Sequence, residues 1–103
     1  MNDHPPELTS AQVAARLHEV TVVDVRDPGS YRRSHIPGAL SVLDHNVGEF
    51  VASADKSRCV VVVCYHGNSS LGGAAYFLQS GFVEVYSMAG GMADWGSRPT
   101  EAG

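Results

Sequence analysis

The sequence predicts an α/β fold with a mainly parallel central sheet of about five short strands and helices on both faces. One observation is the run Cys59–Val63, which is apolar and β-branched without a polar face, as expected of a strand buried on both sides of a sheet. Strand-like runs also alternate with segments of helical periodicity, which favours parallel pairing. The length of 103 residues suits one domain, with a core over about 8–97 and loose ends at 1–7 and 98–103.

The first elements follow from local signals. Pro5-Pro6 excludes helix, so residues 1–7 should form a loose arm. A helix should begin near Thr9-Ser10, because Thr9 and Gln12 have the spacing of a capping box. Its apolar edge comprises Val13, Leu17 and Val20. A short buried strand is expected next, over 21–25.

The chain then predicts a second helix and a turn. Asp27 and Pro28 occupy the N-cap and first-turn positions of a short helix over 28–34, which Tyr31 should anchor. The Pro-Gly pair within 35–39 is typical of a turn. The remaining expected elements are a strand over 40–42, a weaker helix over 44–54, the central strand, a helix over 71–81, a strand over 83–86 and a short helix over 92–95 that buries Trp95.

The stretch 64–70, Cys-Tyr-His-Gly-Asn-Ser-Ser, should form a tight loop between the central strand and a helix. Gly67 and Asn68 tolerate positive φ, so the loop can curl with its amide N–H groups pointing inward. Ser69 or Ser70 can cap the helix. Converging amides at a helix N-terminus form an anion site.

A cysteine in such a loop is favoured as a thiolate, the nucleophilic form, which makes Cys64 the candidate nucleophile. The alternative is a structural cysteine that merely ends a core strand. The second cysteine, Cys59, lies roughly 16 Å away along an extended strand, far beyond the ~7 Å limit between the Cα atoms of a disulfide. It should face the opposite side of the sheet, so a single thiol carries any chemistry.

The composition excludes several classes of function. The formal net charge of −4 gives no electrostatic reason to expect nucleic acid or an acidic membrane as a partner. No apolar run approaches the length of a membrane span, and the first residues lack the regions of a secretory signal, so the expected compartment is the cytoplasm. The histidines show no ligand spacing, so no metal is expected.

The assembled motifs resemble the rhodanese family over nearly the whole chain, from about residue 8 to Trp95. The residues that carry the resemblance are the strand Val22-Val23-Asp24-Val25-Arg26, the turn His35-Ile36-Pro37-Gly38-Ala39, the loop from Cys64, and Gly90-Gly91-Met92-Ala93-Asp94-Trp95. The loop is similar to that of bacterial single-domain thiosulfate sulfurtransferases. The resemblance implies a rhodanese-like fold and no cofactor.

The resemblance also implies a reaction and its site. The Cys64 thiolate would take sulfane sulfur from thiosulfate or a similar donor as a persulfide and pass it to cyanide or a dithiol, a thioredoxin being a candidate acceptor. The residues expected to cradle that persulfide are Tyr65, His66, Gly67, Asn68, Ser69 and Ser70, with Ser69 as a hydrogen-bond donor. The expected assembly is a monomer or a homodimer.

One position departs from the family pattern. Leu71 stands where these enzymes carry a lysine, which would hold the sulfonate end of thiosulfate. The candidates to supply a substitute cation are Arg26, Arg32, Arg33 and Arg98, of which Arg26 and Arg33, with Leu71 itself, are the expected substrate-binding positions. Asp24 and Arg26 either shape the crevice or form a plain structural ion pair.

Other readings of the loop remain open. Leu71 favours a non-catalytic or partner-fed persulfide carrier. A cysteine phosphatase fits less well, because its loop needs an arginine six positions after the cysteine, where Ser70 stands. His66 either acts as a base or points to solvent and contributes only its amide, and His35 is expected to fix the turn rather than to act in catalysis.

Overall fold

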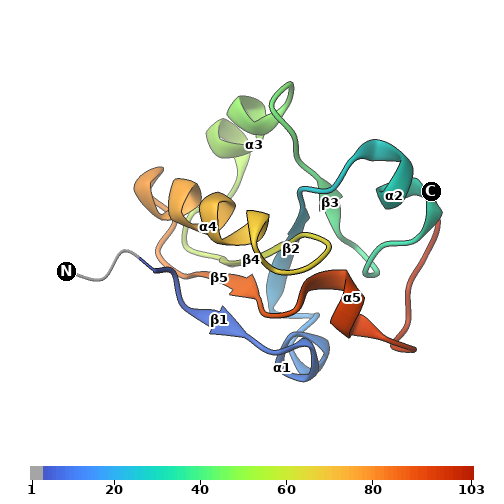
Figure 1. Cartoon of the computed structure of the whole chain (residues 1–103). Helices are drawn as coiled ribbons and strands as arrows, with labels where there is room; N and C mark the ends of the chain where they lie inside the picture. Colours follow the sequence, from blue (N-terminus) through green and yellow to red (C-terminus); the bar gives the residue numbers. More distant parts are fainter. Residues whose placement is uncertain (1–3) are drawn as a thin grey trace.

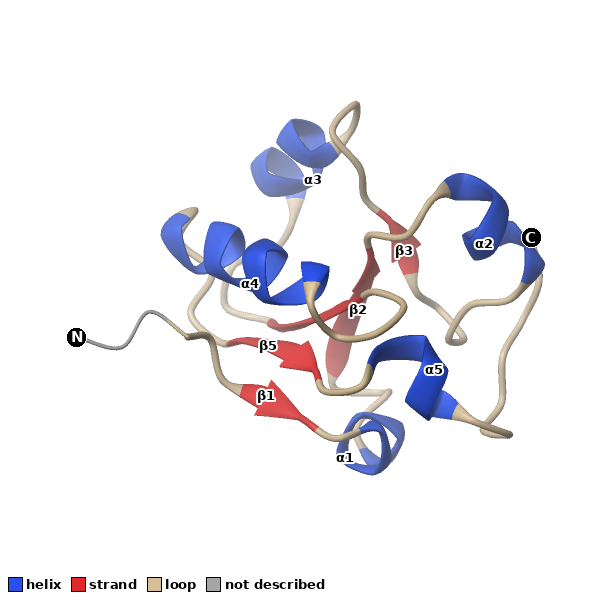
Figure 2. Ribbon diagram, in the orientation of Figure 1, coloured by secondary structure: helices blue, strands red, loops and turns tan. Residues whose placement is uncertain are grey.

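Five strands form one sheet in the order β1-β5-β4-β2-β3, and every ladder between them is parallel. The computed structural model describes residues 4–103 (Figures 1 and 2). The strands are β1 (Glu7–Leu8), β2 (Val20–Asp24), β3 (Leu40–Ser41), β4 (Cys59–Val63) and β5 (Val85–Met88). The helices are α1 (Ser10–Ala15), α2 (Pro28–Arg33), α3 (Val47–Ser53), α4 (Ser69–Gln79) and α5 (Gly91–Trp95). The predicted parallel sheet with flanking helices is confirmed.

The central strand β4 is buried along its whole length, and its side chains feed two hydrophobic cores. Cys59, Val61 and Val63 point to a core shared with α1 and α5, where Trp95 is buried. Val60 and Val62 point to a second core shared with α3 and α4. Figure 1 shows these two pairs of helices on opposite sides of the sheet. Both faces of β4 are therefore covered, which explains why its sequence lacks a polar face.

The connections after β2 and β4 leave the sheet in opposite directions. These two strands are neighbours, yet β2 continues to β3 on one side while β4 continues to β5 on the other. In a parallel sheet such a reversal opens a crevice at the carboxyl ends of the two strands. The chain segments that follow Asp24 and Val63, which pair in the β2–β4 ladder, therefore face each other across it.

The helix boundaries largely follow the predicted signals. Thr9 caps α1 and forms the expected capping box with Gln12. Asp27 caps α2, with Pro28 at its start. Helix α4 ends in a Schellman motif, in which the predicted Gly81 takes a φ of +104°. Among the helices within residues 4–103, none is long and apolar enough to cross a bilayer.

Several boundaries were predicted wrongly. Helix α1 ends at Ala15, and Val20, expected on its apolar edge, begins strand β2. Valine suits both settings, so its pattern alone could not decide between helix and strand. Strand β5 also runs two residues later than expected, and α3 begins only at Val47.

The N-terminal arm is not loose where the structure describes it. Glu7–Leu8 pairs with the outer edge of β5 as strand β1, and the Ser87 amide donates to the carbonyl of Pro6 at 3.0 Å. Proline lacks an amide donor but keeps its carbonyl, so it can lie next to an edge strand. Residues 1–3 of the predicted arm lie outside the described residues.

The C-terminal tail, expected to be frayed, is held by the turn after α2. His35 and Glu101 form an antiparallel bridge, with both amide-to-carbonyl distances at 2.9 Å. The Glu101 carboxylate also accepts from the amide of Gly38 at 2.9 Å. These contacts join segments far apart in the sequence, so no local pattern announced them.

Candidate active site

The loop between β4 and α4 begins at Cys64 and curls at Gly67, whose φ is +93°. The close approach of the neighbouring backbone also requires glycine there, because a β-carbon would lie 2.8 Å from the amide nitrogen of Gly90. Asn68, expected to share the positive φ, has a φ of −92° and is the N-cap of α4 without a side-chain cap. Ser69 and Ser70 are therefore the first residues of the helix and not its caps.

The loop directs hydrogen-bond donors at the sulfur of Cys64. The amides of Gly67 and Ser70 donate to Sγ at 3.0 and 3.3 Å, and the Ser70 hydroxyl oxygen lies 3.3 Å from it. Cys64 is only 5 % exposed. The thiol is thus buried among polar donors rather than among aliphatic side chains, which supports the anion-site interpretation over a structural cysteine.

These contacts set the acidity of the thiol. Burial acts to raise the pKa of Cys64, but hydrogen bonds from the hydroxyl and amide of Ser70 and from the amides of Gly67 and His66 outweigh it. The net effect places the pKa below the ordinary value of a cysteine. Burial and the nearby Glu84 carboxylate instead raise the pKa of Cys59, which lies in the core shared with α1 and α5.

Helix α5 holds the loop from behind. The amides of Met92 and Ala93 donate to the carbonyl oxygens of Cys64 and Tyr65, both at 2.8 Å. Gly91 permits this approach, because a β-carbon there would lie 2.5 Å from those two oxygens. In the sequence these paired glycines were one motif of the family resemblance, and no local pattern indicated that they support the nucleophile.

A pocket of about 550 Å³ adjoins the sulfur at the crevice predicted by the topology. Its lining from the segment after β2 and from α2 consists of Val25, Arg26, Asp27, Ser30 and Arg33. Its lining from the loop and the start of α4 consists of Cys64, Tyr65 and Ser69. The structure thus places two of the predicted substrate-binding residues, Arg26 and Arg33, on the nucleophile's pocket.

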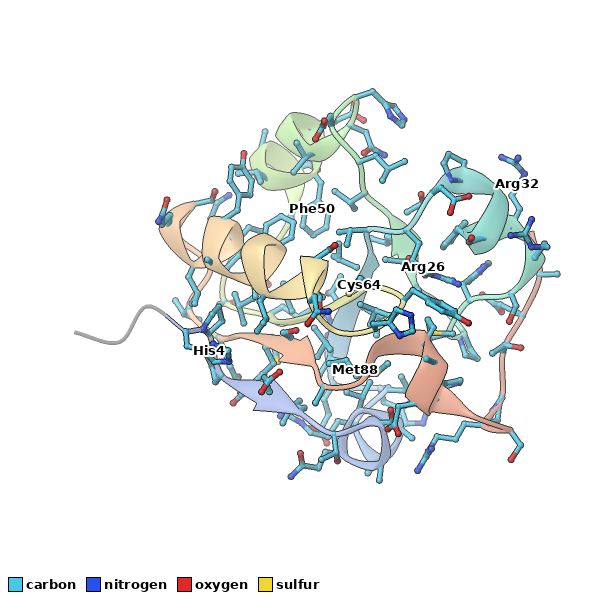
Figure 3. All side chains as sticks on the ribbon, in the orientation of Figure 1. His4, Arg26, Arg32, Phe50, Cys64 and Met88 are labelled. Atoms are coloured by element: carbon cyan, nitrogen blue, oxygen red, sulfur yellow. The ribbon has the colours of Figure 1, made fainter. Side chains whose placement is uncertain are left out.

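The arginines near this pocket differ in how they are held. Arg26 lies beside Cys64 in Figure 3, and its guanidinium binds the buried Asp24 carboxylate at 2.7 Å and the Ser34 carbonyl at 2.7 Å. The predicted ion pair is therefore present, and it also forms a wall of the crevice. Arg33 is exposed, and its guanidinium donates to the Ser30 hydroxyl at 3.3 Å.

The other predicted cation positions lie away from the pocket lining. Arg32 is exposed at the outer edge of the molecule in Figure 3. Arg98 donates to the carbonyl of Trp95 and lies over its ring at 5.9 Å from the centroid. Leu71 is half-buried in the first turn of α4 and does not line the pocket.

The two histidines near the site have separate environments. His66 is exposed, and its ring contacts the ring of Tyr65, with centroids 4.5 Å apart. Its amide, not its imidazole, affects the sulfur, which favours the interpretation without a catalytic base. His35 donates through Nδ1 to the Tyr31 carbonyl at 2.7 Å, and its imidazole stacks on the Tyr31 ring. It therefore fixes the turn as predicted.

One contact of the site was not anticipated. The Ser70 hydroxyl, besides facing the sulfur, lies 2.7 Å from the hydroxyl of Ser87 on β5. Both serines are completely buried. The sequence signal for this contact was a serine facing inward from an otherwise apolar strand. It was missed because the strand was expected to end at Tyr86, one residue before Ser87.

The chain is similar to known proteins over most of its length. The model of the family described as "Rhodanese-like domain" matches residues 9–98. The chain is 54 % identical over 82 residues to the thiosulfate sulfurtransferase GlpE of Pseudomonas paraeruginosa, covering 80 % of this chain and 74 % of that protein. It is 44 % identical over 93 residues to the protein of the same name from Pseudomonas fluorescens, covering 90 % and 83 %.

Solved structures support the fold. The Alr3790 protein from Anabaena sp. superimposes with a TM-score of 0.83 at 27 % identity, covering 92 % of this chain and 81 % of that one. A rhodanese-related protein from Thermoplasma volcanium gives a TM-score of 0.83 at 21 % identity, covering 93 % and 97 %. At that identity the second likeness speaks for the fold alone.

Proposed function

The chain belongs to the family of rhodanese-like domains, and from that premise we propose that it is a thiosulfate sulfurtransferase that carries sulfur as a persulfide on Cys64. The observation that carries the proposal is the polar surrounding of Sγ: the amides of Gly67 and Ser70 donate to it, and the Ser70 hydroxyl oxygen lies 3.3 Å away. They favour the thiolate needed for attack. The thiosulfate sulfurtransferases to which the chain is 54 % and 44 % identical support the reaction class and the donor.

The reaction takes place in two displacements. The Cys64 thiolate attacks the outer sulfur of thiosulfate, the sulfur–sulfur bond of the donor breaks with its electron pair, and sulfite leaves. A persulfide anion remains on Cys64. Cyanide then attacks the outer persulfide sulfur, thiocyanate leaves, and the thiolate is regenerated. The thiolate and the persulfide of Cys64 are both anions held in the same loop. The same fixed N–H groups therefore stabilise the enzyme in both steps.

Arg33 is our candidate for the missing family lysine. It lines the pocket across from Cys64, and in contrast to Arg26 its guanidinium has no carboxylate partner at salt-bridge distance among residues 4–103. A guanidinium can bind two sulfonate oxygens of thiosulfate while the outer sulfur faces the thiolate. The Arg26 guanidinium is bound to the Asp24 carboxylate and forms part of the pocket wall.

The test is formation of thiocyanate from thiosulfate and cyanide by the purified chain. We expect steady turnover by the wild type and none by Cys64→Ala. Mass spectrometry after thiosulfate alone should show one added sulfur, on the peptide that contains Cys64. An active Cys64→Ala variant, or a sulfur adduct on Cys59 alone, would refute the assignment of the nucleophile.

The arginine assignment has a matched control in the adjacent residue. Arg33→Gln should raise the KM for thiosulfate roughly three- to tenfold, as expected for one exposed charged hydrogen bond, and leave kcat nearly unchanged. Arg32→Gln removes the same charge outside the pocket lining and should leave KM close to the wild-type value. Equal effects of both variants would mean that only the net charge of this region matters.

Leu71 supports a second candidate, a carrier loaded by a partner enzyme. Persulfide carriage needs Cys64 and its cradle but no handle for a free donor. A chain that acquires sulfur only from a partner would show no thiocyanate with thiosulfate, yet would hold a persulfide made chemically. Use of 3-mercaptopyruvate instead of thiosulfate would identify a different donor.

The acceptor in the cell is the remaining part of the proposal. Tyr65 lines the pocket and is 57 % exposed, so the pocket opens to solvent on this side and a thiol on another molecule can approach the outer sulfur. A dithiol such as that of a reduced thioredoxin would attack this sulfur and close to a disulfide, releasing sulfide. Loss of the extra sulfur from loaded protein on addition of reduced thioredoxin, measured by mass spectrometry, tests this step.

A further inference from the structure

A chain of three buried side chains runs from the nucleophile into the sheet. The sulfur of Cys64 lies 3.3 Å from the hydroxyl oxygen of Ser70, which lies 2.7 Å from the hydroxyl oxygen of Ser87. The two serines have no exposed surface, and Cys64 has 5 %. Water therefore does not set the orientation of these hydroxyl protons, and the three groups must satisfy one another.

The direction of the protons depends on the charge of the sulfur. A thiolate accepts only, so the Ser70 hydroxyl must give it its single proton and then accept from Ser87. A neutral thiol can instead donate to Ser70, whose proton then goes to Ser87. In this second arrangement the Ser87 proton needs another acceptor, and residues 4–103 show no hydrogen bond of that hydroxyl other than the one with Ser70.

We propose that Ser87 is a positioning residue for the nucleophile: its hydroxyl donates to Ser70 and thereby directs the Ser70 proton at the sulfur of Cys64. The arrangement that satisfies Ser87 is the one in which the sulfur receives a hydrogen bond. Ser87 thus favours the thiolate without contacting the sulfur. The proposal rests on the sulfur-transfer function assigned to Cys64, which gives the thiolate its role.

The test measures the thiolate directly and does not require sulfur transfer. The rate of alkylation of Cys64 by iodoacetamide is followed against pH, with the labelled peptide identified by mass spectrometry. Ser87→Ala should raise the apparent pKa of Cys64 by about half a unit to one unit, the size expected for one hydrogen bond. Failure of the thiocyanate assay would refute the proposed function while leaving this measurement interpretable.

A double-mutant cycle separates action through Ser70 from a general loosening of the fold. Ser70→Ala alone should raise the pKa more than Ser87→Ala does, since it removes the direct contact. In the Ser70→Ala background, Ser87→Ala should have no further effect. An unchanged pKa in Ser87→Ala, or the same shift with and without the Ser70 hydroxyl, would overturn the proposal.

The control variant removes a buried serine hydroxyl that does not belong to the chain of Cys64, Ser70 and Ser87. Ser10→Ala removes another buried serine hydroxyl, one that donates to Asp94 at 3.0 Å, and should leave the pKa of Cys64 unchanged. Should Ser87→Ala fold poorly, Ser87→Cys has nearly the same shape and a weaker donor, and it should give a smaller shift in the same direction. The charged groups facing the sulfur across the pocket are Arg26, Asp27 and Arg33, and all are unaltered.

Discussion

The amide of Met92 donates to the carbonyl oxygen of Cys64 at 2.8 Å, so the first turn of α5 holds the peptide of the nucleophile itself. The amide of Ala93 holds the next carbonyl, that of Tyr65, at the same distance. With its carbonyls bound behind it, the loop presents its amides to the sulfur in front. The paired glycines before Met92 allow the two backbones to approach this closely.

Gly91→Ala should displace the loop and impair sulfur transfer. A β-carbon at this position would lie 2.5 Å from the carbonyl oxygens of Cys64 and Tyr65, so the loop must move. Misplacement of reacting groups by about 1 Å can lower a rate on the order of 100-fold, and we expect a loss of that size in kcat/KM with thiosulfate.

The matched control for this variant is Gly96→Ala. Gly96 has nearly the same φ, +66° against +62°, but a β-carbon there would meet nothing closer than 3.9 Å. Both variants should lose about 1–3 kcal/mol of stability because alanine is strained at positive φ, and Gly91→Ala should lose more because of its clash with the loop. Only Gly91→Ala should lose activity. Equal losses of activity would mean that backbone strain alone, without a clash with the loop, impairs sulfur transfer.

The rate of persulfide formation should rise with pH, and the midpoint of that rise should lie below the pH at which an ordinary cysteine is half ionised, about 8.5. The reason is that hydrogen bonds from Ser70, Gly67 and His66 overcome the effect of burial and lower the pKa of Cys64. Single-turnover loading with thiosulfate, followed by mass spectrometry, gives this profile. A midpoint at or above about pH 8.5 would contradict the lowered pKa.

The same shift predicts how stability depends on pH. Between the folded and unfolded pKa values of Cys64 the unfolded chain binds more protons, so stability rises with pH in that window. This contribution is fully present above about pH 8.5 and is lost as the pH falls through the folded pKa. The free energy of unfolding of wild type minus that of Cys64→Ala should therefore increase over this window, since Cys59 contributes equally to both chains.

The sequence was sufficient for the features that depend on local chemistry. The all-apolar run in β4 identified the central strand, and the glycine at position 67 identified a curled loop after it. The capping box of Thr9 and the closing glycine at 81 identified two helix ends. The nucleophile follows from these elements, because Cys64 is the first residue past the buried strand.

Features that depend on distant partners could not be predicted in this way. Asn68, Ser69 and Ser70 are all good caps, and local preference does not choose among them. Contacts of Ser70 with the sulfur and with Ser87 place it inside the helix, and those partners lie in other elements. The contact of Glu101 with His35 spans most of the chain, so the ordered tail was also missed.

The paired glycines of α4 should respond in opposite ways to alanine. A β-carbon at Gly72 meets nothing within 4 Å, so Gly72→Ala should stabilise the chain by about 0.5–1 kcal/mol through helix propensity. At Gly73 it would lie 3.0 Å from Cγ1 of Val62, which is fully buried in the sheet. Overpacking should exceed the propensity gain, for a net loss of about 1 kcal/mol. Urea unfolding measures the stability change of each variant. Stabilisation by Gly73→Ala would show that the Val62 side chain can shift to admit the added β-carbon.

Leu71→Lys should lower the KM for thiosulfate. Leu71 lies in the first turn of α4, two residues after Ser69, which lines the pocket. The leucine does not line the pocket itself, but a lysine side chain is longer and can direct its ammonium toward the donor's sulfonate. A charge-assisted contact of about 1 kcal/mol corresponds to a roughly fivefold lower KM. Persulfide formation at saturating thiosulfate should be unimpaired, because the cradle around Cys64 uses backbone amides and Ser70.

The control is Leu71→Gln, which adds polarity without charge and should leave the KM for thiosulfate near the wild-type value. The cation has a small cost, since a positive charge in the first turn opposes the helix dipole, and we expect a loss of roughly 0.3–1 kcal/mol in the free energy of unfolding. Combining Leu71→Lys with Arg33→Gln then asks whether the two cations serve the same sulfonate. If they do, the lysine should restore the KM that the arginine variant lost. Steady-state kinetics in which Leu71→Lys leaves the KM unchanged or raises it would show that this position does not reach the donor.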